Sequence, residues 1–108
     1  MAKYLLLYSG GEGMPESEDE IAKELKAWEV WYTNLGKAVA DPGNPITPAK
    51  KMIASNGAVR DGSVAPTATG YTIVEAESID DAVKMAKGCP VLKSGAEVSV
   101  FETFEVMS

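Results

Sequence analysis

The second half of the chain carries a close series of secondary-structure signals, and this series restricts the fold more than any other feature. An apolar run over 70–76 is followed by a capped helical pattern over 78–88, a Cys89-Pro90 pair that stops the helix, and alternating apolar residues over 97–106. The pattern predicts a strand, a helix and a second strand. The apolar residues of the helix are expected to face the sheet, and they are Ile79, Ala82, Val83 and Ala86.

The first half begins with the same order of elements. Residues 3–9 read as a strand, and Ser17 with Glu20 forms a capping box that opens a helix ending near Gly36. Because Trp31 lies at the edge of the helical apolar stripe, we expect it to be only partly covered. The stripe itself consists of Ile21, Leu25, Trp28, Tyr32 and Leu35.

Between the two halves lies a proline-rich connection followed by a hairpin signal. Asn56-Gly57 separates 51–55 from 58–60 and is typical of a tight β-turn, because both residues tolerate positive φ. We take this hairpin as the second strand of the sheet. The whole order then predicts a single α+β domain over 1–108, a ferredoxin-like split βαβ sandwich with an antiparallel sheet and two helices on one face.

The first strand is apolar on both of its faces. Tyr4, Leu6 and Tyr8 alternate with Leu5 and Leu7, so both faces favour burial. Two helices of one chain cover one face of a sheet, and 108 residues hardly supply a second layer. We therefore expect a second subunit on the other face, in a homodimer.

Composition and charge exclude several classes of function. The net charge of −6 without a Lys/Arg cluster argues against a nucleic-acid partner. No apolar stretch approaches the roughly 20 residues that span a bilayer, so we expect no membrane partner and a cytoplasmic protein. The chain has no histidine and one cysteine, so we expect no metal and no cofactor, and a small molecule as a possible ligand.

Two further features favour structural roles. The glycine-rich segment over 10–13 lacks a following Lys-Ser/Thr pair, and Glu12 would repel an anion, so we interpret it as a loop rather than a phosphate cradle. Cys89 follows a helix C-terminus, where the dipole disfavours a thiolate. We expect Cys89 to be an inert, buried residue.

The chain carries several short motifs in a defined order, which are the opening 3–8, Trp28 and Trp31 before Leu35-Gly36, Asp61-Gly62 before Gly70-Tyr71, Asp81-Ala82 and Cys89-Pro90. Taken together in order and spacing, these motifs resemble the YCII-related or DGPF domain family. The resemblance implies a ferredoxin-like protomer that pairs into a dimeric α/β barrel. It also marks Asp61 as a motif position, but Ser63-Val64 stands where the family has Pro-Phe, and the family's histidine is missing, so no His-Asp mechanism carries over.

The candidate site residues are either loop residues or aromatic residues, and we place them around a pocket between the sheet and the helices. Asp61 is the candidate catalytic base, and the candidate ligand-binding residues are Tyr8, Trp31, Asp41 and Arg60. If the protein is an enzyme, an isomerase or lyase-like reaction fits these groups best. The alternative is that the aspartates only form turns and the aromatics only pack the core. In that case the chain is a non-catalytic binding, regulatory or oligomerisation domain.

Overall fold

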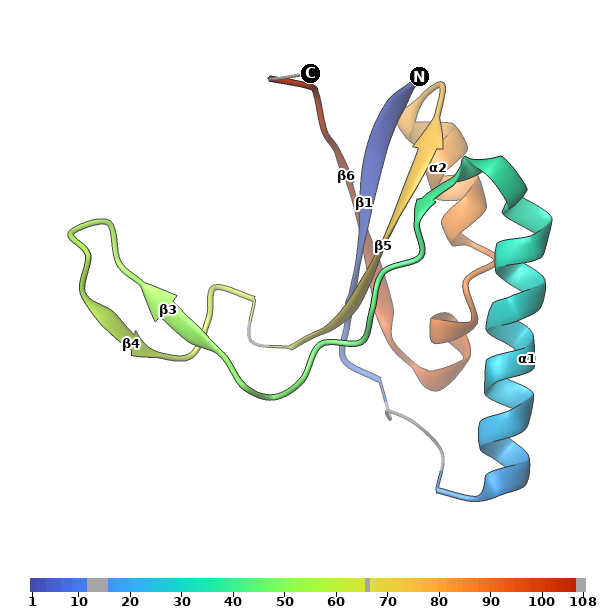
Figure 1. Ribbon diagram of the computed structural model, residues 1–108, viewed down its shortest axis with the longest axis horizontal. Coiled ribbons are helices and arrows are strands. Elements are labelled where there is room, and N and C mark those ends of the chain that lie inside the picture. Colours follow the sequence, from blue (N-terminus) through green and yellow to red (C-terminus); the bar gives the residue numbers. More distant parts are fainter. Residues whose placement is uncertain (12–15, 66, 107–108) are drawn as a thin grey trace.

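A four-stranded antiparallel sheet forms the centre of the protein in the computed structural model, which describes residues 1–11, 16–65 and 67–106 (Figure 1). The expected arrangement over 12–15 lies outside the described residues. In sheet order, the strands are β2 (Val39–Asp41), β5 (Ala68–Ala76), β1 (Ala2–Ser9) and β6 (Glu97–Glu102). The helical elements are α1 (Glu18–Leu35), η1 (Gly36–Ala38), α2 (Ile79–Ala86) and η2 (Pro90–Ser94).

Both α-helices lie on one face of this sheet, which confirms the predicted ferredoxin-like fold. The predicted caps form as well. The Ser17 hydroxyl accepts a hydrogen bond from the Glu20 N–H at 3.2 Å, and Ser78 accepts from the Asp81 N–H at 3.1 Å. Each cap satisfies an N–H group that the first helical turn would otherwise leave unpaired.

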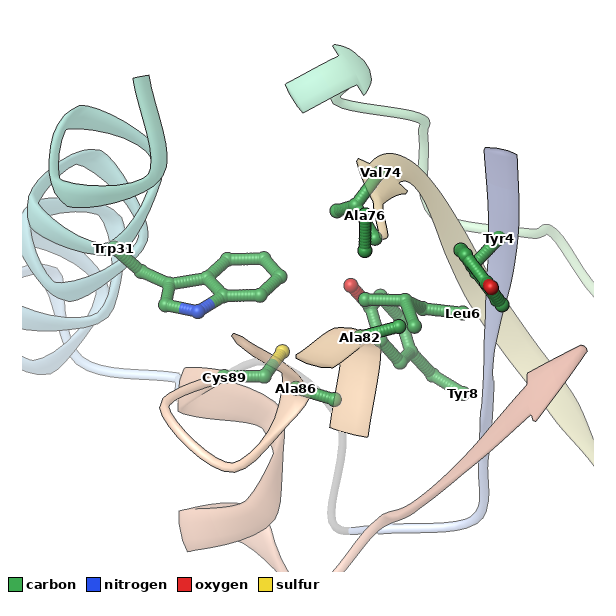
Figure 2. Packing of buried hydrophobic residues seen from close by; sticks show 9 residues of the cluster. All are labelled: Tyr4, Leu6, Tyr8, Trp31, Val74, Ala76, Ala82, Ala86 and Cys89. Carbon is green, nitrogen blue, oxygen red and sulfur yellow. The ribbon is translucent and has the colours of Figure 1, made fainter. Parts of the chain in front are cut away.

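The hydrophobic core fills the space between the sheet and the helices. Alternate residues of β1 and β5 point into it, and α2 contributes the small side chains of Ala82 and Ala86, which allow the helix to approach the sheet closely (Figure 2). Ile79 is 43% exposed, so its predicted place against the sheet is wrong. An eight-residue helix buries only a narrow face, and Ala82 and Ala86 are its buried residues.

The buried face of α1 is rotated relative to the predicted stripe. Trp31 is its most buried residue at 5% exposure, whereas Leu25 is 58% exposed. The Trp31 indole reaches from α1 across to α2, where its Nε1–H donates to the Met85 carbonyl oxygen at 2.9 Å (Figure 2). A tryptophan that satisfies its N–H and buries its large ring determines the face of the helix more strongly than a leucine nearly two turns away.

The predicted hairpin does not form the second strand of the sheet, so this prediction was wrong. The edge strand is β2, which pairs with β5, while β3 (Lys51–Ile53) and β4 (Val59–Asp61) form a separate two-stranded sheet. We call residues 51–61 the arm. In Figure 1 the arm extends from the sheet on the side opposite the helices. Three prolines between β2 and β3 lack the N–H that continued pairing needs, so the chain leaves the sheet there.

The turn at the tip of the arm also differs in detail from the prediction. Gly57 alone takes a positive φ, of 90°, and its N–H donates to the Ala54 carbonyl at 2.8 Å, while the Asn56 side chain accepts from the Ala58 N–H at 3.0 Å. This is a longer loop that contains a left-handed glycine rather than a two-residue turn with two positive φ values.

The last strand is shorter than predicted. It ends at Glu102 rather than at 106, and the apolar side chains of Phe104 and Val106 are exposed. In the register that pairs Tyr4 with Glu102, the first residue of β1, Ala2, lies opposite position 104, so residues beyond 104 have no strand beside them to continue the ladder.

Candidate functional site

The structure places the predicted site residues in three separate regions of the chain. Tyr8 and Trp31 are buried in the core. Asp41 ends the edge strand β2, and Arg60 and Asp61 lie on β4 of the arm. Within one chain, therefore, the core pair and the arm pair are not brought together.

Tyr8 belongs to a chain of hydrogen bonds that links the core to the connection after β2. Its hydroxyl donates to Thr72 Oγ1 at 2.6 Å, Thr72 donates to the Pro42 carbonyl oxygen at 3.0 Å, and Tyr32 donates to the same oxygen at 3.0 Å. Burial raises the pKa of Tyr8 strongly, so the phenol stays protonated and acts as a donor. This series of hydrogen bonds links β1, β5 and α1 to one backbone carbonyl.

Thr72 is a member of this group that the sequence analysis missed. It is fully buried, and it is the polar position among the inward-facing residues of β5. The signal that could have identified it is a hydroxyl residue at an alternate position of an otherwise apolar strand. Such a residue needs a buried hydrogen-bond partner.

Four aromatic rings from β1 and α1 pack beside these hydroxyl groups. Neighbouring ring centroids lie 5.3 to 5.7 Å apart among Tyr8, Trp28, Trp31 and Tyr32. Cys89 is buried in the same core, and burial raises the pKa of its thiol. These side chains occupy the space in which the sequence analysis expected a pocket.

Asp41 is engaged in a tight turn. Its Oδ1 accepts from the Gly43 N–H at 2.8 Å, and Gly43 has a φ of 75°. A side chain at 43 would meet the backbone of β5, because an added Cβ would lie 1.7 Å from the Tyr71 carbonyl oxygen. The arrangement fits an Asx turn that directs the chain past the sheet edge.

The arm presents two chemically different faces. Lys51 pairs with Asp61 and Ile53 with Val59 across the two strands, so these four residues share one face, while Met52 and Arg60 share the other. Lys51 Nζ lies 2.5 Å from Asp61 Oδ1, and both side chains are largely exposed. An exposed pair of this kind contributes at most about 1 kcal/mol. The Asp61 carboxylate therefore remains accessible to a ligand or to another chain.

The hollows formed by the described residues include one at the root of the arm and one near the chain ends. The larger, of about 420 Å³, lies at the root of the arm and is lined by Lys50 and by 46–48, 63–65 and 67–69. Ser63 Oγ, on this lining, is buried without a hydrogen-bond partner among the described residues. The smaller, of about 280 Å³, lies where 1–3 meet 102–105. Neither lies between the sheet and the helices.

The same described ranges lack a cluster of metal-binding side chains and a helix suited to span a membrane. They contain no group of three or more Cys, Asp or Glu side chains placed to hold a metal ion. They also contain no helix with the length and apolar character needed to cross a bilayer.

The fold is similar to that of a known small-molecule enzyme. No family model and no curated protein match the chain. Among solved structures, it is similar to 5-chloro-2-hydroxyhydroquinone dehydrochlorinase from Burkholderia phenoliruptrix in complex with 2,5-dihydroxybenzoquinone, with a TM-score of 0.57 and 18% identity over 95% of this chain and 93% of that chain. At this identity the likeness shows the fold, an α+β sandwich of the ferredoxin-like class.

Proposed function

We propose that this protein is a homodimer that binds a small molecule, or converts one, at the hollow beside the root of the arm. We also assign it to the YCII-related family, whose dimeric α/β barrel the sequence motifs implied. The proposal combines the fold, the uncovered face of the sheet and the position of the hollow.

The uncovered face of the sheet supports the dimer. Leu5 lies between Ile73 of β5 and Phe101 of β6, and Leu7 lies beside Tyr71, so apolar side chains continue across three strands. Both helices lie on the opposite face, and Phe101 remains half exposed. A continuous apolar patch on a single chain is typical of a protein interface. We call this surface the open face.

The hollow at the root of the arm carries the proposal of a ligand site. Its volume of about 420 Å³ lies within the usual range for small-molecule pockets. Apolar side chains and threonine hydroxyls line it, and Ser63 Oγ is a buried group that a ligand could pair. Asp61 lies two residues from Ser63, and Arg60 precedes it. In the catalytic form of the proposal, Asp61 is the base and Arg60 stabilises developing negative charge.

The structural neighbour suggests the first probe, because its complex contains 2,5-dihydroxybenzoquinone. We expect titration with this compound and with related dihydroxybenzenes to shift the NMR signals of 63–65 and 67–69. Ala65→Leu narrows the hollow and should weaken binding at least tenfold, whereas Ala22→Leu, on the exposed side of α1, should leave binding unchanged.

Ligand-induced shifts of NMR signals confined to the core residues around Tyr8 and Trp31 would contradict this placement. They would indicate a site in the space between the sheet and the helices. Turnover of a bound compound is tested in parallel with Asp61→Asn, which removes the charge and keeps the shape. Equal turnover in Asp61→Asn and the wild type would remove Asp61 from the mechanism while leaving the binding site in place.

A further inference from the structure

We infer that the arm is an interlocking element: in the dimer each arm packs on the partner subunit through its Ile53–Val59 face, and the partner closes the hollow at the root of that arm. The inference rests on the proposed dimer. It adds that the ligand site is complete only when two chains are assembled.

The first observation is the exposure of apolar side chains along the arm and at its root. Ile53 is 70% exposed and its cross-strand neighbour Val59 is 63% exposed. Val64, on the lining of the hollow, is 92% exposed. Large apolar residues gathered on one projecting segment indicate that another surface covers them.

The second observation is that the arm is too small to be stable by its own contacts. It has two strands of three residues each, joined by a short loop. An isolated two-stranded hairpin is marginally stable in water and needs a further strand or a packed surface. On the side facing away from Ile53 and Val59, Met52 is already partly covered. A covering surface is therefore most needed on the Ile53–Val59 face.

The third observation identifies the occupant as a second copy of this chain. The arm projects on the same side of the sheet as the open face, opposite both helices (Figure 1). A subunit that covers the open face is thus placed beside the arm, so one molecule can cover both. By the twofold symmetry usual for dimers, each chain then both provides an arm and receives one.

The charge of the arm also supports a second copy of this chain as the covering surface. The arm carries Lys51 and Arg60 with a single carboxylate, in a chain whose net charge is −6. A second copy as a whole is therefore acidic, and its net charge attracts a basic arm rather than repelling it.

The test compares self-association of the wild type with Ile53→Thr/Val59→Thr by sedimentation equilibrium. Threonine retains the β-branch, and both positions are exposed in the single chain, so the fold should be kept. We expect the dimer dissociation constant to rise at least tenfold. Leu25→Gln, an exposed apolar position on α1, is the matched control and should leave the constant unchanged.

Closure of the hollow is measured separately with a polarity-sensitive dye attached to the introduced thiol of Val64→Cys. The native Cys89 is buried, so the dye should label position 64 and not position 89. The dye emission should shift to the blue as concentration drives dimerisation, whereas a dye on Lys26→Cys should not respond. An unchanged dissociation constant or an unshifted Val64 dye in a protein that dimerises would overturn this inference alone. A wild type that stays monomeric at all concentrations would overturn the dimer proposal first, and the inference with it.

Discussion

At the scale of single residues, the hydroxyl groups of the core are matched to each other. Tyr8 donates to Thr72, and Thr72 and Tyr32 both donate to the Pro42 carbonyl, so each of these hydroxyl groups has a partner within the protein. The same residues show why sequence alone could not separate a ligand-binding role from a packing role. Tyr8 is a plausible ligand contact by type, and only its partner Thr72, 64 positions away, reveals that its hydrogen is already donated.

We predict that Tyr8→Phe lowers the free energy of unfolding by about 1 to 2 kcal/mol at pH 7, because Thr72 loses its buried donor. The variant should also flatten the alkaline pH dependence. The folded pKa of Tyr8 is raised, so above about pH 10 the unfolded chain releases this proton while the folded chain retains it, and stability falls as pH rises. Urea unfolding from pH 7 to 11 measures both effects. An equally steep decline in Tyr8→Phe would contradict the assignment.

We predict that Cys89 reacts slowly with thiol reagents in the native protein. The residue is 2% exposed, and burial raises the pKa of its thiol, so both access and thiolate fraction are low. At pH 8 the native protein should react at least about a hundredfold more slowly than the urea-unfolded chain, since reaction requires opening. Equal rates would show that the thiol is accessible and would make Cys89 a candidate nucleophile.

At the scale of elements, the segment after β2 determines how the arm leaves the sheet. Gly43 lies directly against the backbone of β5, and Pro45 forms an isolated bridge with Gly70. The prolines prevent further pairing, and the glycine allows the close passage. The arm is thus positioned by the chain at its root rather than by contacts at its tip.

We predict that Gly43→Ala destabilises the protein by about 3 kcal/mol or more, because the new Cβ cannot coexist with the Tyr71 carbonyl. Gly95→Ala is the matched comparison. Gly95 also has a positive φ, of 85°, but nothing lies within 4 Å of an added Cβ, so only the backbone cost of about 1 kcal/mol applies. Thermal melting of both variants separates the two effects, and similar losses would argue against the close approach.

At the scale of the whole molecule, one layer of helices leaves half of the sheet surface without a cover from the same chain. The molecule measures 45 × 38 × 20 Å along its principal axes, and the arm accounts for much of the long dimension in Figure 1. A second copy on the open face would convert this flat, extended shape into a compact assembly.

We predict that Leu7→Glu yields a folded monomer. Leu7 is half-buried on the open face, so a single chain tolerates the change, whereas a twofold interface would bury two like charges and weaken association by more than about a hundredfold. Light scattering measures the mass, and circular dichroism checks the fold. Val30→Glu adds the same charge on the exposed side of α1 and should leave the dimer intact. A Leu7→Glu dimer as stable as the wild type would place the interface elsewhere.

The elements that could be predicted from the sequence are those that depend on local chemistry. The caps at Ser17 and Ser78, the alternating strand β1 and the glycine turn at the arm tip are each specified by neighbouring residues, and together they define the ferredoxin-like order. The homodimer and the ligand site stay predictions, although the two-sided pattern of β1 was readable from the start.

Three features depend on contacts made in the folded protein: the strand that joins the sheet, the face of α1 that is buried, and the positions of the candidate residues. Val39–Asp41 is too short to be recognised as a strand, and it pairs because β5 offers an edge beside it. Trp31 turns inward because Met85, 54 positions away, accepts its N–H. Asp61 is separated from Tyr8 because the arm leaves the sheet. Each outcome depends on contacts between residues far apart along the chain, which local patterns do not encode.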